Sequence, residues 1–167
     1  ASDSKAERFL DLLRASLQNL ELTPLAFSNS PGELLNALFM GENHKGFALG
    51  NECRMQDLSE QKSVATWRHT ILSDSSIRQH VIDGMKLTHL QVEYNDRMSF
   101  VMADNGAISK IRFPEGDAAD INDEEDPVAL LDARFVLLAG TVRKLTGDLK
   151  KLLGGYASPQ DQQADAA

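Results

Sequence analysis

The chain of 167 residues has one cysteine, one tryptophan and no long apolar run. A lone Cys53 cannot form a disulfide within the chain, and such sparing use of cysteine is typical of proteins in a reducing cytoplasm. No stretch approaches the ~18 to 20 apolar residues of a membrane span, and no signal peptide is visible. With 42% hydrophobic and 25% charged residues, the composition is that of a soluble globular protein.

Motifs of catalysis and cofactor binding are also missing. The sequence has no glycine-rich nucleotide loop, no nucleophile elbow and no pair of Cys or His at metal-ligand spacing. His69, His80 and His89 fall in different predicted elements, and the acidic run 123–126 lacks the interleaved glycine of a calcium loop. The sequence therefore predicts no cofactor, no metal site and no enzyme activity.

Charge is distributed unevenly along the chain. There are 25 acidic and 17 basic side chains, for a net charge of −8, which at first sight argues against nucleic acid as a ligand. However, residues 51–112 carry eight of each sign, whereas residues 113–167 carry eleven acidic and five basic ones. These counts leave room for a basic patch in the middle of the chain.

The most informative stretch, Lys86 to Phe113, alternates apolar and polar residues and contains Asn105-Gly106. Asn-Gly between alternating runs predicts a two-residue hairpin turn, because a type I′ turn needs positive φ at both central positions. The expected pairs are Asp104 with Ala107, Met102 with Ser109, Val101 with Lys110, Phe100 with Ile111 and Ser99 with Arg112. Paired residues share a face. The apolar face would hold Met98, Phe100, Met102, Ile111 and Phe113, and the polar face Ser99, Val101, Ile108, Lys110 and Arg112.

The preceding turn, at Asn95-Asp96, has two possible lengths. A two-residue loop would place apolar residues of the first strand, among them Tyr94, beside Lys110, which a half-buried sheet does not tolerate. A three-residue loop, ending at Arg97, returns Leu90, Val92 and Tyr94 to the apolar face. We therefore predict the longer loop, which leaves His89, Gln91 and Glu93 beside Lys110 and Arg112.

Spacing and capping signals predict the remaining elements. Helices are expected from Ser4 to about Asn19, from a capping box at Ser30–Glu33 to Gly41, and from Ser73 to Gly84. Leu22–Phe27 is predicted to be extended at a sheet edge, because Pro24 lacks a backbone donor. Strands are predicted over Glu52–Leu58 and Lys62–Ile71.

The longest predicted helix begins at Asp126-Pro127 and extends to about Leu153, before Gly154-Gly155. Its apolar stripe is wide enough to meet more than one neighbour. Part of Leu130–Leu152 is therefore expected either on the sheet or at a two-fold interface. The acidic segment before it, Pro114 to Asp126, shows no periodicity and is predicted to be a solvated linker.

The segment Thr66 to Thr70, TWRHT, is a candidate contact surface. On a strand, Arg68 shares a face with the two threonines, whereas Trp67 and His69 point the opposite way. Arginine neutralises phosphates and threonine hydroxyls donate to phosphate oxygens. The alternative is a solvated strand face above a core tryptophan.

Four stretches of this sequence resemble the recombination-associated protein RdgC family. LQVEYNDRMSFVMADNGAISKIRF contains RMSFV, which fits the family pattern R-[IMV]-[SQ]-F-V followed by a basic, apolar strand. AERFLDLLRASLQNLELTPL, VATWRHTILSDSSIRQHVIDGMK and DARFVLLAGTVRKLTGDLKKLLGG are similar to its first helix and strand, its basic strand and helix, and its closing helix. The resemblance covers about residues 5–155 in order and corresponds to roughly the C-terminal half of a family member.

The resemblance implies a bacterial, nucleoid-associated protein that binds DNA, mainly double-stranded, with little sequence preference. Family members form ring-shaped homodimers around a positively charged hole and restrain RecA-dependent recombination. By position, the family's basic strand falls on Arg68 and His69, with Thr70 beside them. The end of its following helix falls on Met85-Lys86.

The sequence thus predicts an α+β fold with an antiparallel meander, helices on one face and a long C-terminal helix. We expect a helical and extended segment at 1–50, an α+β domain at 51–155 and a disordered tail at 156–167. The predicted function is DNA binding through phosphate contacts, without chemistry. The rival is a protein-interaction or dimerisation module. The expected DNA-binding residues are Arg68, His69, Thr70, Lys86, Lys110 and Arg112.

Overall fold

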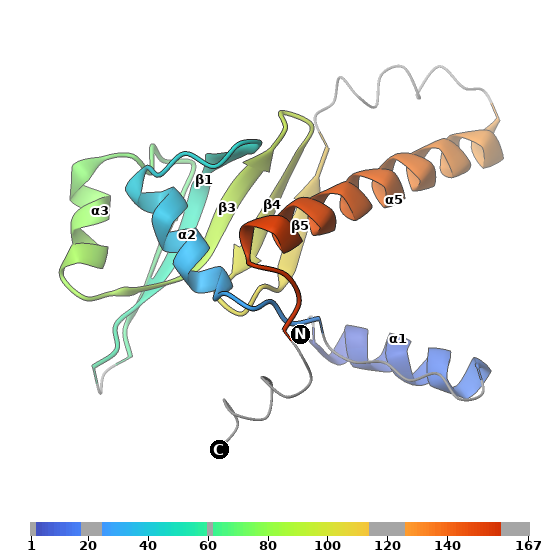
Figure 1. The fold of residues 1–167 in the computed structure, drawn as a ribbon, viewed down its shortest axis with the longest axis horizontal. Helices are drawn as coiled ribbons and strands as arrows, with labels where there is room; N and C mark the ends of the chain where they lie inside the picture. The colour runs from blue at the N-terminus through green and yellow to red at the C-terminus, as the bar shows by residue number, and fades with distance from the viewer. Residues whose placement is uncertain (1–2, 18–24, 60–61, 114–125, 158–167) are drawn as a thin grey trace.

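The computed structural model describes residues 3–17, 25–59, 62–113 and 126–157, and it has the predicted α+β fold (Figure 1). Five antiparallel strands form one sheet in the order β2-β1-β3-β4-β5. The strands are β1 (Phe47–Gln56), β2 (Val64–Arg68), β3 (Lys86–Tyr94), β4 (Met98–Ala103) and β5 (Ile108–Arg112). The helices are α1 (Asp3–Ser16), α2 (Pro31–Met40), α3 (Ser75–Ile82) and α5 (Pro127–Leu152).

The core lies between one face of the sheet and the helices that cover it. α2 and the C-terminal part of α5 lie over the same face (Figure 1). Phe100 and Leu35 are fully buried there, and Leu149 is 3% exposed. The Tyr94 hydroxyl donates to Asp148 Oδ2 at 2.6 Å, which ties α5 to β3. The opposite face of the sheet is lined by polar side chains.

The turn between β3 and β4 has the predicted three residues. Tyr94 pairs with Met98, and Asn95 and Asp96 have φ values of 50° and 55°. Leu90, Val92 and Tyr94 are all buried, as the alternation argument required.

The turn between β4 and β5 is one residue longer than predicted. Ala103 N donates to Ala107 O, and Gly106 N donates to Ala103 O, both at 2.9 Å. Gly106 has a φ of 84°, as in three-residue loops that end in a left-handed residue.

The longer loop shifts the register of β5. Met102 pairs with Ile108 and Val101 with Ser109, and only the predicted pair Ser99–Arg112 is present. Lys110, at a φ of 51°, forms a bulge that restores the predicted alignment. The prediction that Ile108 lies on the polar face is therefore wrong, because a one-residue shift moves a side chain to the other face.

The first two strands differ from their predicted bounds. β1 begins at Phe47, five residues before the predicted Glu52, because Phe47 pairs with Tyr94 beyond Gly50. β2 ends at Arg68, since the next residue has a left-handed φ of 54°.

Two predicted caps also need correction. α2 ends at a left-handed Gly41 as expected, but Ser30 makes no side-chain capping bond. α3 starts after Asp74 and not at Ser73, because the Asp74 carboxylate accepts a hydrogen bond from Ser76 N at 2.8 Å. The predictions for residues 18–24, 60–61, 114–125 and 158–167 lie outside the described residues.

The two halves of α5 have different surroundings. Leu145 and Leu149 pack on the sheet, at 1% and 3% exposure, which confirms the first of the two predicted contacts. Towards its N-terminus the helix extends beyond the sheet (Figure 1). Val128, Leu131 and Phe135 are 73%, 70% and 64% exposed there. None of the described helices combines the length and apolar character needed to cross a bilayer.

Candidate nucleic-acid interface

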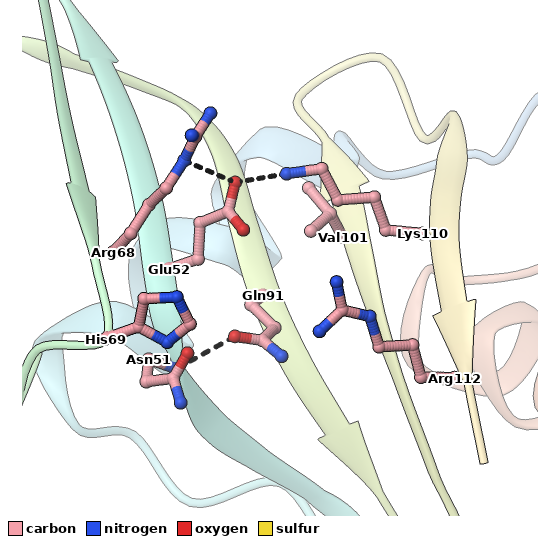
Figure 2. Close-up of a pocket in the computed structure, with 8 residues that line it drawn as sticks. All are labelled: Asn51, Glu52, Arg68, His69, Gln91, Val101, Lys110 and Arg112. Atoms are coloured by element: carbon pink, nitrogen blue, oxygen red, sulfur yellow. Dashed lines mark hydrogen bonds and ion pairs between the residues drawn. The ribbon is translucent and has the colours of Figure 1, made fainter.

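Two adjoining hollows of about 590 and 480 Å³ lie on the sheet face opposite the core. Side chains from all five strands or the residues that follow them line these hollows, and Figure 2 shows the larger one. We call this surface the basic trough. Its charged lining residues are the cations Arg54, Arg68, Lys110 and Arg112 and the carboxylate Glu52.

The pairing of β1 with β3 is irregular beside Glu52. Leu49 lies opposite Val92 and Cys53 opposite Leu90, so three residues of β1 oppose Gln91 alone. At Gly50 an added Cβ would lie 2.8 Å from the Gln91 side chain, so this close approach requires glycine. Asn51 N donates to Gln91 Oε1 at 3.2 Å. Across the other edge of β1, Glu52 pairs with Arg68 of β2.

The end of β2 differs from the predicted alternation. His69 was expected to point away from Arg68, but both line the larger hollow, because the left-handed φ of His69 turns the chain. Trp67 keeps its place on the core side, with its ring centroid 5.1 Å from that of His80. Thr70 lines neither hollow, and its hydroxyl donates to the Arg68 carbonyl at 3.1 Å.

β5 supplies two cations at the opposite edge of the sheet. Lys110 Nζ forms an ion pair with Glu52, although β3 and β4 lie between their strands. Three strand spacings amount to about 14 Å in a flat sheet, so both side chains reach inward over the face (Figure 2). Val101 lies beneath them, which explains why it is only 5% exposed on a polar face.

The neighbouring cations stabilise the ionised form of Glu52. Its Oε1 lies 3.6 Å from Arg68 Nε as well as against Lys110. The hydrogen bond from Lys110, with the charges of Arg68 and Arg112, lowers the pKa of Glu52 despite its burial. The Arg112 side chain makes no hydrogen bond or ion pair with the described part of the chain.

His89 lies at the other end of the trough. It lines the smaller hollow with Arg54. Burial lowers the pKa of His89, and the neighbouring charge of Arg54 lowers it further. The trough therefore disfavours the charged form of this imidazole.

Lys86 lies apart from the other predicted residues. It pairs with Gln56 at the far end of β1, and its Nζ is 2.7 Å from Asp104 Oδ2. It lines neither hollow. Of the six predicted residues, the structure brings Arg68, His69, Lys110 and Arg112 together, and it separates Thr70 and Lys86 from them.

Sequence reasoning missed Glu52 and Arg54 as parts of this surface, and it missed the contact that Gln91 makes with Asn51. Alternation could have placed Glu52 and Arg54 there, because strand residues alternate between faces and the apolar Cys53 and Met55 alternate with them. In the structure Cys53 and Met55 are indeed buried. Gln91 was placed on the correct face, but its role against Asn51 depends on the irregular pairing of β1. Among the described residues no three His, Cys, Asp or Glu side chains are grouped as metal ligands.

Comparison with known proteins agrees with the resemblance in the sequence. The family described as "RdgC: Putative exonuclease, RdgC" matches residues 1–156. The recombination-associated protein RdgC of Pseudomonas aeruginosa is 31% identical over 163 residues, which are 96% of this chain and 53% of that protein. The protein of the same name from Xanthomonas oryzae pv. oryzae is 30% identical over 148 residues, 87% of this chain and 49% of its own length. The chain thus spans about half the length of these relatives, and it belongs to the RdgC family.

Proposed function

We propose that this chain supplies a sequence-independent DNA-binding surface, with the basic trough as the contact face. The observation that carries the proposal is the charge of the trough. Four cations and one carboxylate line one concave surface of a chain whose net charge is −8. A local excess of positive charge in a concave surface attracts the phosphate backbone of DNA.

The residue types suit phosphates better than bases. Arginine binds phosphate oxygens with two parallel donors, and lysine acts as a point charge. The Arg112 side chain has no ion pair among the described residues, so binding a phosphate there would break no ion pair within this part of the protein. Phosphate contacts fix the position of the duplex but do not read its sequence. Binding is therefore expected to be independent of sequence.

The relatives are named recombination-associated proteins, and we extend the proposal to that setting. The protein would act in the bacterial cytoplasm on nucleoid DNA, as a homodimer, and would restrain RecA-dependent recombination by occupying the duplex. No bond is made or broken in this mechanism.

The test of DNA binding is a salt titration with two unrelated duplexes of equal length. If phosphates are neutralised, the logarithm of the association constant falls with the logarithm of salt concentration by about 0.9 per contact. Arg112→Ala is expected to weaken binding to both duplexes alike and to lower the slope by roughly one unit. Strong discrimination between the duplexes, or affinity that does not change with salt, would contradict the proposal.

The description of the family as an exonuclease provides a competing activity. A labelled duplex incubated with the protein and Mg²⁺ or Mn²⁺ distinguishes the two. We expect the duplex to keep its full length. If the unchanged protein shortens the duplex and a trough variant does not, the function of the trough is cleavage and the proposal of binding without chemistry is wrong.

A second candidate function, self-association, is favoured by the exposed apolar residues of α5. Val128, Leu131, Phe135 and Val136 are each more than 60% exposed, and apolar patches of this kind mark interaction surfaces. Light scattering of Leu131→Asp against the unchanged chain tests it. A dimer that dissociates in the variant supports the second function, and a monomer in both removes it for this chain.

A further inference from the structure

The one acidic side chain of the basic trough occupies its centre. Glu52 comes from β1, whereas its two partners come from β2 and β5, the opposite edges of the sheet. Figure 2 shows the carboxylate between Arg68 and Lys110, with both contacts made by the same oxygen. Glu52 is only 22% exposed, whereas Arg68 and Lys110 are 64% and 45% exposed. The anion is thus the more enclosed partner and the cations form its surroundings.

The contacts of this carboxylate are those that a phosphate would take. A negatively charged oxygen accepts charge-assisted hydrogen bonds from arginine and lysine in both cases. A phosphate at the centre of the trough would use the same two donors, since Arg68 and Lys110 are the cations that converge there. Glu52 and a bound phosphate therefore compete for Arg68 and Lys110.

We infer that Glu52 is an internal competitor of phosphate, which holds Arg68 and Lys110 in the free protein and releases them when a phosphate group binds. This inference rests on the proposed function, because it assigns a role within the same site. The carboxylate keeps the long side chains of Arg68 and Lys110 extended over the sheet face, where Val101 is covered. This pairing lowers the affinity of the trough for phosphate. Arg54 and Arg112, which it does not contact, would make the first contacts with an incoming backbone.

The loss of affinity for phosphate that Glu52 causes is expected to be moderate. Each ion pair is partly exposed, and exposed pairs contribute little because water and salt screen them. Removing the charge of Glu52 releases two such pairs and also removes repulsion between the carboxylate and the phosphate. We expect a gain in affinity of roughly threefold to tenfold at low salt.

The experiment compares Glu52→Gln with the unchanged chain in two binding assays. Glutamine keeps the shape of the side chain and removes its charge. Glu93→Gln is the matched control, because Glu93 is an exposed carboxylate on β3 that lines neither hollow. One assay uses a short DNA duplex and the other inorganic pyrophosphate, both followed by calorimetry. We expect Glu52→Gln to bind both probes more tightly, and Glu93→Gln to differ by less than about twofold.

The outcomes separate this inference from the proposed function. Equal or weaker binding of both probes by Glu52→Gln overturns the inference, and a weaker result assigns Glu52 the opposite role of positioning its two partners. An equal gain in the Glu93→Gln control also overturns it, because the effect would then reflect net charge alone. If no variant binds the duplex but Glu52→Gln gains affinity for pyrophosphate, the proposed function fails and the competition with phosphate remains.

Discussion

The two faces of the sheet are built from the same strands, but their side chains make different kinds of interaction. On the inner face, Leu90, Val92 and Phe100 are completely buried against α2 and α5. On the outer face, the cations of the basic trough converge on one carboxylate, and such exposed pairs contribute little to stability. The inner face therefore accounts for the stability of the fold, and the outer face is free to serve binding. Substitutions on the two faces should separate these properties.

The largest effect is expected from Phe100→Ala on the inner face. Phe100 is 0% exposed, and removing a buried phenyl ring from a core costs about 3 to 5 kcal/mol. Urea denaturation measures the loss in the free energy of unfolding. The fraction of Phe100→Ala that remains folded should still bind the duplex, and its affinity should depend on salt as that of the unchanged chain does. If Phe100→Ala is fully folded and yet does not bind the duplex, packing of the inner face and binding by the outer face are coupled.

The two halves of α5 extend the comparison to a single helix. Leu149→Ala is expected to destabilise the fold by about 2 to 5 kcal/mol because Leu149 is buried. Leu131→Ala removes the same atoms from a residue that is 70% exposed, and should change the free energy of unfolding by less than about 0.5 kcal/mol. Similar losses in the two variants would mean that the N-terminal half of α5 is covered in solution.

On the outer face, Arg54→Ala tests a residue that the sequence did not single out. Its side chain lines the smaller hollow and is exposed. We expect the free energy of unfolding to change by less than about 0.5 kcal/mol, while the salt slope of duplex binding falls by roughly one unit. An unchanged slope would confine the interface to the larger hollow.

The smallest effect on the free energy of unfolding is expected from Asp148→Asn at low pH. The hydrogen bond from Tyr94, aided by Lys151, lowers the pKa of Asp148. A carboxylate with a lowered pKa stabilises the fold above its unfolded pKa, and this stabilisation is lost as the pH falls through the folded value. Asp148→Asn should therefore lose less stability than the unchanged chain on going from pH 5 to pH 3. Parallel curves of unfolding free energy against pH would show that the bond to Tyr94 has no role.

Much of the fold follows from periodicity, and the exceptions lie where local conformation is unusual. The three-residue loop after Tyr94 was predicted because only that length returns three apolar residues to one face. The register of β5 was missed because Asn-Gly suits both a two-residue turn and the last positions of a three-residue loop. The bulge at Lys110 then restores Arg112 to its predicted partner, so this cation was placed correctly for a reason that the sequence does not reveal.

The candidate site was predictable only in part. Lys110 and Arg112 were expected on one polar face and Arg68 among the DNA-binding residues, and the three share the larger hollow. The central position of Glu52 was not predicted, because its contact with Lys110 joins strands that are not neighbours in the sheet. His69 reached the trough through a left-handed backbone angle, which a reading based on alternation excludes.

The most direct test of the basic trough as the DNA-contact face reverses one charge on each of two surfaces. Arg112→Glu places a negative charge in the basic trough, whereas Arg143→Glu makes the same change at an exposed position of α5. Binding of one DNA duplex is measured for both variants and the unchanged chain at one low salt concentration. If the basic trough contacts the phosphates, Arg112→Glu loses more than about tenfold in affinity and Arg143→Glu less than about twofold. Equal losses would show that net charge, and not the basic trough, governs binding.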